Sequence, residues 1–246
     1  MPEEILTAEP PVDAPSRIES YKIFNRISAR YDLLNHLLSA GQDIRWRKKA
    51  VLKLKEYPNQ IVLDLACGTA DLAIASLKYN RNVSIALGID PAEKMLEIGQ
   101  EKVQARGLES KLKLIGGDGM DLPLASNSLD AAMLAFGIRN VEDCDGCLSE
   151  LHRVLKFGGR LVILEFSLPE NRAFRTIYLL YFRYVLPRIG GLISGDRYAY
   201  RYLNRTVETF EYGEAFCEKM RQAGFEEVSM TPLQFGIATI YVGDKD

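Results

Sequence analysis

The hydrophobic pattern divides the chain into helical flanks and a central region in which short apolar runs alternate with amphipathic segments. Residues 17–55 repeat apolar side chains at helical spacing, first from Ile18 to Ile27 and again from Ile44 to Leu54. Between residues 60 and 166, the same analysis predicts buried strands separated by helices. The expected strands are Gln60–Ala66, Val83–Asp90, Lys111–Gly116, Ser128–Phe136 and Arg160–Phe166; the expected helices are Asp71–Tyr79, Ala92–Gly107 and a segment ending at Lys156.

This alternation predicts an α/β fold with a doubly wound, mostly parallel sheet. An aromatic-rich helical insertion follows, from about residue 170 to about residue 210. A helix over Tyr212–Ala223 then precedes two closing strands, Phe225–Thr231 and Phe235–Val242, which we expect to form an antiparallel edge. We expect one domain over residues 17–246, preceded by a proline-rich, disordered segment over residues 1–16.

Composition and charge narrow the function classes. The chain is 47% hydrophobic and 26% charged, which is typical of an ordinary globular protein. A formal net charge of −2 gives no general attraction to phosphate backbones, so no nucleic-acid partner is expected. The segment Met1–Ser16 does not resemble a signal peptide, and no stretch is long enough to span a bilayer. A cytoplasmic location is therefore expected.

Four cysteines do not form a disulfide framework in a chain of this size. Cys144 and Cys147 form an isolated CxxC, but Cys147 also begins an apolar stripe that continues at helical spacing to Leu155. The chain has only two histidines, His36 and His152, to complete a metal site. We therefore expect a thiol packed at the start of a helix and no metal.

Ligands of doubly wound sheets lie beyond the carboxyl ends of the strands, so the loop after the first strand is the first candidate site. Its small residues, from Asp64 to Asp71, resemble a nucleotide-binding loop, although Gly68 is its only glycine. A negative charge at Asp64 would oppose a pyrophosphate and favour a cationic ligand such as S-adenosylmethionine. The alternative is that Asp64 bonds loop amides and only shapes the turn.

Two further aspartates follow the next two strands. Asp90 ends the second strand, where an acidic side chain accepts hydrogen bonds from ribose hydroxyls. Asp118 follows the third strand and is placed to meet an adenine edge. One aspartate at a strand end more often caps a loop than binds a ligand. Three at successive strand ends predict a nucleoside ligand, without specifying the second substrate.

Longer motifs resemble those of a known family. One is Tyr31–Ser39 (YDLLNHLLS), continuing to Trp46, and another is Arg153–Gly159 (RVLKFGG), continuing through Glu165–Ser167. The run Phe136–Val141 (FGIRNV) after the fourth strand is also similar. On these motifs the chain, from about Tyr21 to Val242, resembles the ubiquinone/menaquinone biosynthesis C-methyltransferases.

The resemblance implies a Rossmann-like class I methyltransferase fold and a reaction that uses S-adenosylmethionine. The methyl acceptor it implies is a ring carbon on a prenylated quinol head group, either a naphthoquinol or a benzoquinol. The cofactor positions that it implies are Thr69, Asp90, Asp118 and Gly119, to which the loop pattern adds Asp64 and Gly68.

Three residues are candidates for catalysis. Arg139 and Asn140 follow the fourth strand and are suited to hold the quinol oxygen, while Tyr31 would close the site from the N-terminal helix. Because arginine is too basic to take the quinol proton, we expect a water held by Arg139 to take it. The structural alternatives are a buried ion pair for Arg139 and a core aromatic for Tyr31.

The chain departs from the family pattern at four positions. Leu34 replaces a usual methionine, Asp43 a histidine and Phe157 a proline, and we expect these to be tolerated because they fall on helix or turn positions. Ala70 replaces a glycine of the cofactor loop. We expect Ala70 to be tolerated as well, since a residue that opens a helix needs no positive φ.

The segment Phe174–Ile193 combines many apolar side chains with Arg175, Arg183 and Arg188. Such a surface suits a lid that touches an isoprenoid tail at the bilayer surface, and packing on the protein's own core explains it equally well. Peripheral contact with the inner face of the membrane, and a homo-oligomer, are left open.

Other functions are also left open. The acceptor of a methyltransferase could instead be a sterol or a small phenol. A nicotinamide-dependent oxidoreductase would use the same sheet, but Asp64 and the missing glycines disfavour it. A non-catalytic module that only binds the cofactor is a further alternative.

Overall fold

A seven-stranded sheet in the order β3-β2-β1-β4-β5-β7-β6 forms the centre of the molecule. The computed structural model describes residues 20–39, 41–185, 188 and 197–246, so the segment 1–16 lies outside the described residues. The parallel strands are β1 (Gln60–Leu65), β2 (Val83–Asp90), β3 (Leu112–Gly116), β4 (Leu129–Ala135) and β5 (Leu155–Phe166). β7 (Ala238–Lys245) runs antiparallel to both β5 and β6 (Glu226–Leu233), which confirms the predicted fold class and the antiparallel edge.

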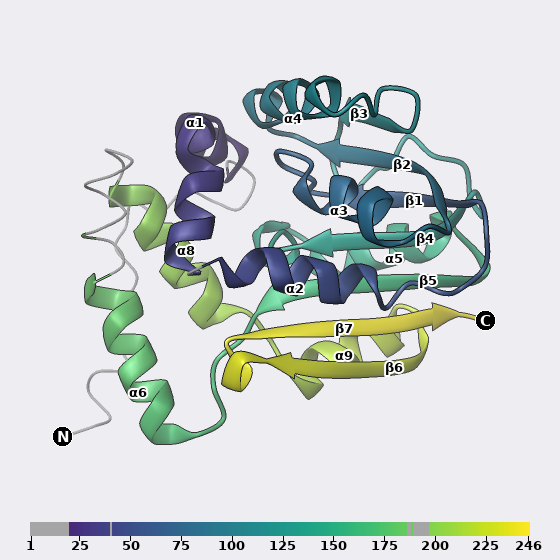
Figure 1. The fold of residues 1–246 in the computed structure, drawn as a ribbon. Helices are drawn as coiled ribbons and strands as arrows, with labels where there is room; N and C mark the ends of the chain where they lie inside the picture. Colours follow the sequence, from purple (N-terminus) through teal and green to yellow (C-terminus); the bar gives the residue numbers. More distant parts are fainter. Residues whose placement is uncertain (1–19, 40, 186–187, 189–196) are drawn as a thin grey trace.

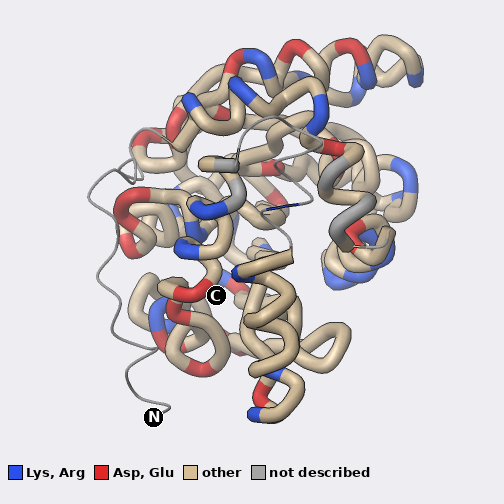
Figure 2. The backbone as a smooth tube through the Cα atoms, turned by 90° about the vertical axis from the view of Figure 1, so that its left-hand side faces the viewer, with Lys and Arg blue, Asp and Glu red and all other residues tan. Residues whose placement is uncertain are grey.

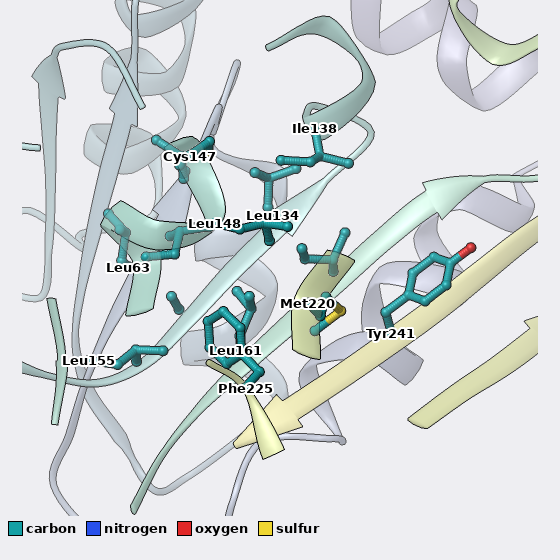
Figure 3. Close-up of a cluster of buried hydrophobic side chains, with 14 of the residues drawn as sticks. Leu63, Leu134, Ile138, Cys147, Leu148, Leu155, Leu161, Met220, Phe225 and Tyr241 are labelled. Atoms are coloured by element: carbon teal, nitrogen blue, oxygen red, sulfur yellow. The ribbon is translucent and has the colours of Figure 1, made fainter. Parts of the chain in front are cut away.

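Helices cover both faces of the sheet (Figure 1). α2 (Gln42–Val51), α3 (Asp71–Tyr79) and α4 (Glu93–Ala105) pack on one face. α5 (Cys144–Val154) and α9 (Glu214–Gln222) pack on the other, where Cys147 and Leu148 meet Leu134 and Leu161 of the strands (Figure 3). Cys147 is fully buried there, and none of the four cysteines, all of which lie in the described part of the chain, forms a disulfide. The Cys147 thiol thus packs at the start of a helix, as expected.

A third group of helices lies beyond the carboxyl ends of the parallel strands, at the left of Figure 1. It consists of α1 (Ser20–Leu38), α6 (Arg172–Leu180), the π-helical turn η3 (Tyr181–Val185) and α8 (Arg197–Thr209). Short 3₁₀ turns, η2 (Ile138–Asn140) and η4 (Gln234–Gly236), follow β4 and β6. No helix among the described residues is long and apolar enough to cross a bilayer. Figure 2 shows basic and acidic residues intermixed along the chain.

Two strands begin three or more residues away from their predicted start. β5 begins at Leu155 rather than Arg160, because Gly158 adopts a left-handed conformation (φ 78°) and lets the strand continue through an irregular register with β4. β7 begins at Ala238 rather than Phe235, because Phe235 has a φ of 59° and belongs to the η4 turn. Apolar periodicity does not detect either backbone feature.

Candidate active site

A cavity of about 320 Å³ lies at the carboxyl ends of β1, β2 and β4. The strand order reverses between β1 and β4, which is the position where doubly wound sheets bind ligands. Its walls come from the loops that follow four successive strands and from the first half of α1. They include Gly68, Asp90, Asp118, Gly119, Gly137 and Tyr21.

The loop after β1 owes its shape to left-handed residues. Ala66, Gly68 and Ala70 have φ values of 52°, 53° and 66°. The expectation that Ala70 needs no positive φ is therefore wrong, because the chain must reverse sharply before α3 can begin. Alternating left-handed residues turn backbone N–H groups towards one side, which suits a polar ligand.

Asp90 ties this loop to β2. Its carboxylate accepts hydrogen bonds from the backbone N–H groups of Gly68 and Ala92, each at 2.8 Å. Burial raises the pKa of the Asp90 carboxyl, and these two hydrogen bonds oppose the rise. Asp90 thus lines the cavity and also fixes the loop, so both of its roles depend on one carboxylate.

Asp64 lies behind the loop and is not among the described residues that line either cavity of the site. It is 1% exposed, and its carboxyl accepts a hydrogen bond from Ala73 N–H at 2.8 Å. Burial raises the pKa of Asp64 to about 8, so at neutral pH its carboxyl is mostly uncharged. This geometry favours the alternative in which Asp64 shapes the start of α3.

Thr69 faces α1 rather than the cavity. Its hydroxyl donates to Asp32 of α1 at 2.6 Å and accepts from the Lys102 ammonium at 2.8 Å. Lys102 also pairs with Asp32 and Asp71, at 2.6 Å each. These four residues form a latch (Asp32, Thr69, Asp71 and Lys102) that holds α1 over the cofactor loop.

The residues of this cavity fit S-adenosylmethionine. A Cβ added at Gly137 would lie 2.6 Å from the Cβ of Ala66, so only glycine lets these two loops approach each other. Asp118 is held by its bond from Met120 N–H at 3.1 Å, and Gly119 follows it at the rim. A cradle of close loops with carboxylates at two strand ends suits a nucleoside.

A second cavity of about 480 Å³ adjoins the first and is mainly apolar. α1, α2, α6, η3 and α8 enclose it, with Ile27, Trp46, Phe166, Tyr178, Phe182 and Leu203 among its walls. Phe24, Tyr31, Phe136 and Asn140 line both cavities. Phe136 has a φ of 59°, a strained conformation that directs the chain from β4 into this shared wall.

Arg139 lines the second cavity and not the first. Its guanidinium, 4% exposed, pairs with Glu165 at 2.7 Å, and its Nη1 also donates to the Phe136 carbonyl. Burial raises the pKa of Glu165, and the Arg139 charge opposes that rise. The buried ion pair that was the structural alternative for Arg139 is present, yet the side chain remains on the cavity wall.

Two buried polar atoms of residues that line the second cavity have no hydrogen-bond partner among the described residues. They are Nε of Arg139, a donor, and Oδ1 of Asn140, an acceptor. A buried polar atom without a partner is costly, so such atoms commonly mark a position where a ligand binds. Tyr31 lies on the same wall, and loss of hydration raises the pKa of its phenol.

Sequence reasoning missed Asp43, which it treated as a tolerated helix position. Asp43 is 3% exposed and lines the second cavity. Its carboxylate accepts from Ser39 Oγ at 2.7 Å, contacts His36 Nδ1 at 2.8 Å and pairs with Arg47 at 2.5 Å. Although burial opposes it, the Ser39 hydrogen bond and the charge of Arg47 lower the pKa of Asp43. The i, i+4 spacing of Asp43 and Arg47 was the available signal.

This sheet order, with a nucleoside-sized cavity at the switch point and an apolar cavity beside it, defines a Rossmann-like methyltransferase that uses S-adenosylmethionine. Residues 15–245 match the ubiE/COQ5 methyltransferase family, and the chain belongs to that family.

Relatives of known name align with nearly the whole of this chain. The demethylmenaquinone methyltransferase of Thermus thermophilus is 48% identical over 224 residues, which cover 91% of this chain and 100% of that one. The ubiquinone/menaquinone biosynthesis C-methyltransferase UbiE of Geotalea daltonii is 43% identical over 225 residues, 91% of this chain and 95% of that one. A solved S-adenosylmethionine-dependent methyltransferase of Thermotoga maritima shares the fold, with a TM-score of 0.66, 22% identity and coverage of 92% and 100%.

Proposed function

We propose that this enzyme methylates a ring carbon of a prenylated quinol, with demethylmenaquinol as the preferred acceptor. The observation that carries the proposal is the unpartnered pair, Arg139 Nε and Asn140 Oδ1, of two residues that line the second cavity. A phenolic hydroxyl both accepts and donates a hydrogen bond, so it satisfies both atoms at once. The apolar remainder of the cavity suits the ring and the start of an isoprenoid tail. The names of the close relatives support the naphthoquinol head group.

The chain's own residues position and activate this acceptor. S-adenosylmethionine, when bound, supplies the electrophilic methyl group. Arg139 donates to the quinol oxygen and stabilises the negative charge that develops there, while Glu165 holds the guanidinium in place. Tyr31 is protonated at neutral pH, and burial raises its pKa further, so its hydroxyl acts as a donor. Phe136 and Phe24 exclude water between the two cavities.

We also propose that the enzyme works in the cytoplasm, at the inner face of the membrane. Tyr178 and Phe182 of the α6–η3 segment line the second cavity, which is the proposed acceptor cavity. Ile177, Leu180 and Tyr184 of the same segment are between 53% and 65% exposed. An apolar segment with one side on the cavity and another exposed suits transfer of a lipid tail from a bilayer. Residues 186, 187 and 189–193 of this insertion lie outside the described residues.

A methyl-transfer assay with defined acceptors tests the proposed function. Purified enzyme and S-adenosylmethionine should convert reduced demethylmenaquinol to the methylated quinol, detected by mass spectrometry. A sterol and a simple phenol serve as alternative acceptors. Methylation of either in preference to both demethylmenaquinol and the ubiquinol-pathway acceptor would contradict the quinol assignment.

Arg139→Lys tests the catalytic wall in the same assay. Lysine keeps a positive charge beside Glu165 but lacks the Nε donor, whereas alanine would leave a buried carboxylate unpaired at a cost of about 3–5 kcal/mol. The turnover rate should fall by about a hundredfold, as when one oxyanion donor is lost. Affinity for S-adenosylmethionine should hardly change. A variant that keeps its turnover rate and loses only cofactor affinity would contradict the assignment.

A further inference from the structure

Methyl transfer to a quinol carbon requires a route for a proton. The reaction forms a carbon–methyl bond and breaks the sulfur–methyl bond and the C–H bond of the same ring carbon. One proton leaves a quinol hydroxyl first, the C–H proton then replaces it on that oxygen, and one proton is released in total. The acceptor cavity is enclosed by apolar and aromatic side chains. A proton released there needs a chain of polar groups to reach solvent, and this requirement rests on the proposed quinol function.

Asp43 is the candidate proton acceptor on the wall of this cavity. Among the described residues that line the cavity, Asp43 has the only carboxylate. The phenols of Tyr31 and Tyr178 have raised pKa values because of burial, and Arg139 is a permanent cation paired with Glu165. Asp43 is therefore the group on this wall that accepts a proton rather than donating one.

The neighbours of Asp43 extend it in both directions. Ser39, whose hydroxyl donates to Oδ1 of Asp43 at 2.7 Å, also lines the cavity. On the other side, Oδ2 lies 2.8 Å from Nδ1 of His36, whose side chain is 40% exposed. Arg47 pairs with the same carboxylate. A continuous series of hydrogen-bonding groups thus leads from the cavity to a solvent-exposed imidazole.

We propose that Ser39, Asp43 and His36 form the route by which the quinol proton leaves the acceptor cavity. The quinol O–H bond breaks and its proton passes to the Asp43 carboxylate, directly or through the Ser39 hydroxyl, which takes one proton as it gives up another. Asp43 then protonates Nδ1 of His36 in the tautomer that carries its own proton on Nε2, and the imidazolium releases that Nε2 proton to water. Exchange with solvent restores the starting tautomer before the next turnover. Arg47 keeps Asp43 ionised between turnovers.

The alternative is a purely structural role, in which Ser39, His36, Asp43 and Arg47 only tie α1 to α2. His36→Gln separates the two roles, because a glutamine amide can keep a hydrogen bond to Asp43 but cannot take up a proton and pass it to water. His152→Gln is the matched control, since His152 is the second histidine of the chain and packs against Phe225 on the far side of α5. Single-turnover methyl transfer is measured for both variants, with and without added imidazole.

The route predicts that His36→Gln slows the methyl-transfer step at least tenfold, with unchanged affinity for S-adenosylmethionine by calorimetry, and that imidazole restores most of the rate. His152→Gln should keep the wild-type rate, and added imidazole should not change that rate.

A wild-type rate in His36→Gln, or a loss that imidazole does not restore, would overturn the proposal. If His36→Gln does not fold, the wild-type enzyme decides: methyl transfer that runs equally fast in H₂O and D₂O overturns the route. Whether the wild-type enzyme methylates the quinol at all tests the proposed function separately.

Discussion

Ala70 shows how one residue sets the conformation of the cofactor loop. Its φ of 66° is a left-handed conformation that costs an alanine roughly 1–2 kcal/mol. The glycine of the family pattern would avoid that cost. However, Ala70 is fully buried, so its methyl group contributes about 0.8 kcal/mol of burial and also restricts the unfolded chain by about 0.4–1 kcal/mol. These opposing effects nearly cancel.

We therefore expect Ala70→Gly to change the free energy of unfolding by less than about 0.5 kcal/mol. Ala70→Val should destabilise the protein by more than about 2 kcal/mol, since a β-branched residue at positive φ is strained and the site is tightly packed. Urea denaturation measures both changes. A large stabilisation by glycine would show that the buried methyl group contributes nothing.

At the scale of elements, α1 is a cover over the cofactor cavity. It contributes Ser20, Tyr21, Phe24 and Tyr31 to the cavity walls. The latch around Lys102 and the hydrogen bond from Lys94 N–H to Asn25 fix it to α3 and α4. Release of the cofactor requires these polar contacts to open.

Lys102→Met should therefore speed dissociation of S-adenosylmethionine. Removing the ammonium leaves Asp32 and Asp71 close together without a cation, and an ion pair of this exposure contributes about 1 kcal/mol, or roughly fivefold. Stopped-flow displacement measures the rate. Lys156→Met, which removes a similar pair with Asp130 on the body of the sheet, is the control. Equal effects of the two substitutions would contradict the role of the latch.

The exposed side of α6 predicts a lipid effect. Ile177→Ser with Leu180→Ser should weaken binding to phosphatidylglycerol vesicles by about tenfold or more, because both side chains would lose apolar burial in the bilayer. Turnover should fall more for a long-tailed quinol in vesicles than for a tail-less analogue. Leu52→Ser, at an equally exposed leucine after α2, is the matched control. Identical losses for both acceptors would favour a packing role.

The elements of the sheet were predictable because each follows from local patterning. Val83–Asp90 and Asp71–Tyr79 have the predicted bounds, since an apolar run or a helical stripe defines them. The candidate site was predictable where it depends on strand ends, as for Asp90 and Asp118. The acceptor cavity was not, because α8, which is far along the chain from α1 and α2, closes it by packing between distant segments. Asp43 could not be recognised as a site residue, because it lines a cavity that the hydrophobic periodicity of the sequence does not reveal.

At the scale of the whole molecule, buried carboxyls concentrate at the functional edge of the sheet. Asp64, Asp90 and Glu165 all have pKa values raised by burial. The core on both faces supplies the stability that offsets these costs. Such arrangements are typical of sites that sacrifice stability for function.

Asp64 makes this cost measurable through pH. Its folded pKa of about 8 lies far above the ordinary value, so the folded state keeps a proton that the unfolded chain has lost. The proton that Asp64 retains in the folded state contributes to the free energy of unfolding. This contribution is fully present below about pH 4 and is lost as pH rises to 8. Asp64→Asn keeps the bond from Ala73 N–H and removes the titration. Its gain in unfolding free energy over the wild type should grow by about 3 kcal/mol between pH 5 and pH 8. Urea denaturation that shows a constant difference would contradict this.

The wall of Phe24, Tyr31, Phe136 and Asn140 has a thermodynamic consequence, because the same four side chains line both cavities. If a ligand in one cavity orders these side chains, the ligand in the other cavity no longer has to order them. The affinity for the methyl donor and the affinity for the quinol are then linked. By reciprocity, the factor by which the methyl donor tightens quinol binding equals the factor by which the quinol tightens donor binding. The demethylated donor, which fills the same cavity, shares that linkage, so product release from one cavity loosens the other. We therefore expect two unlike substrates to bind cooperatively within a single chain.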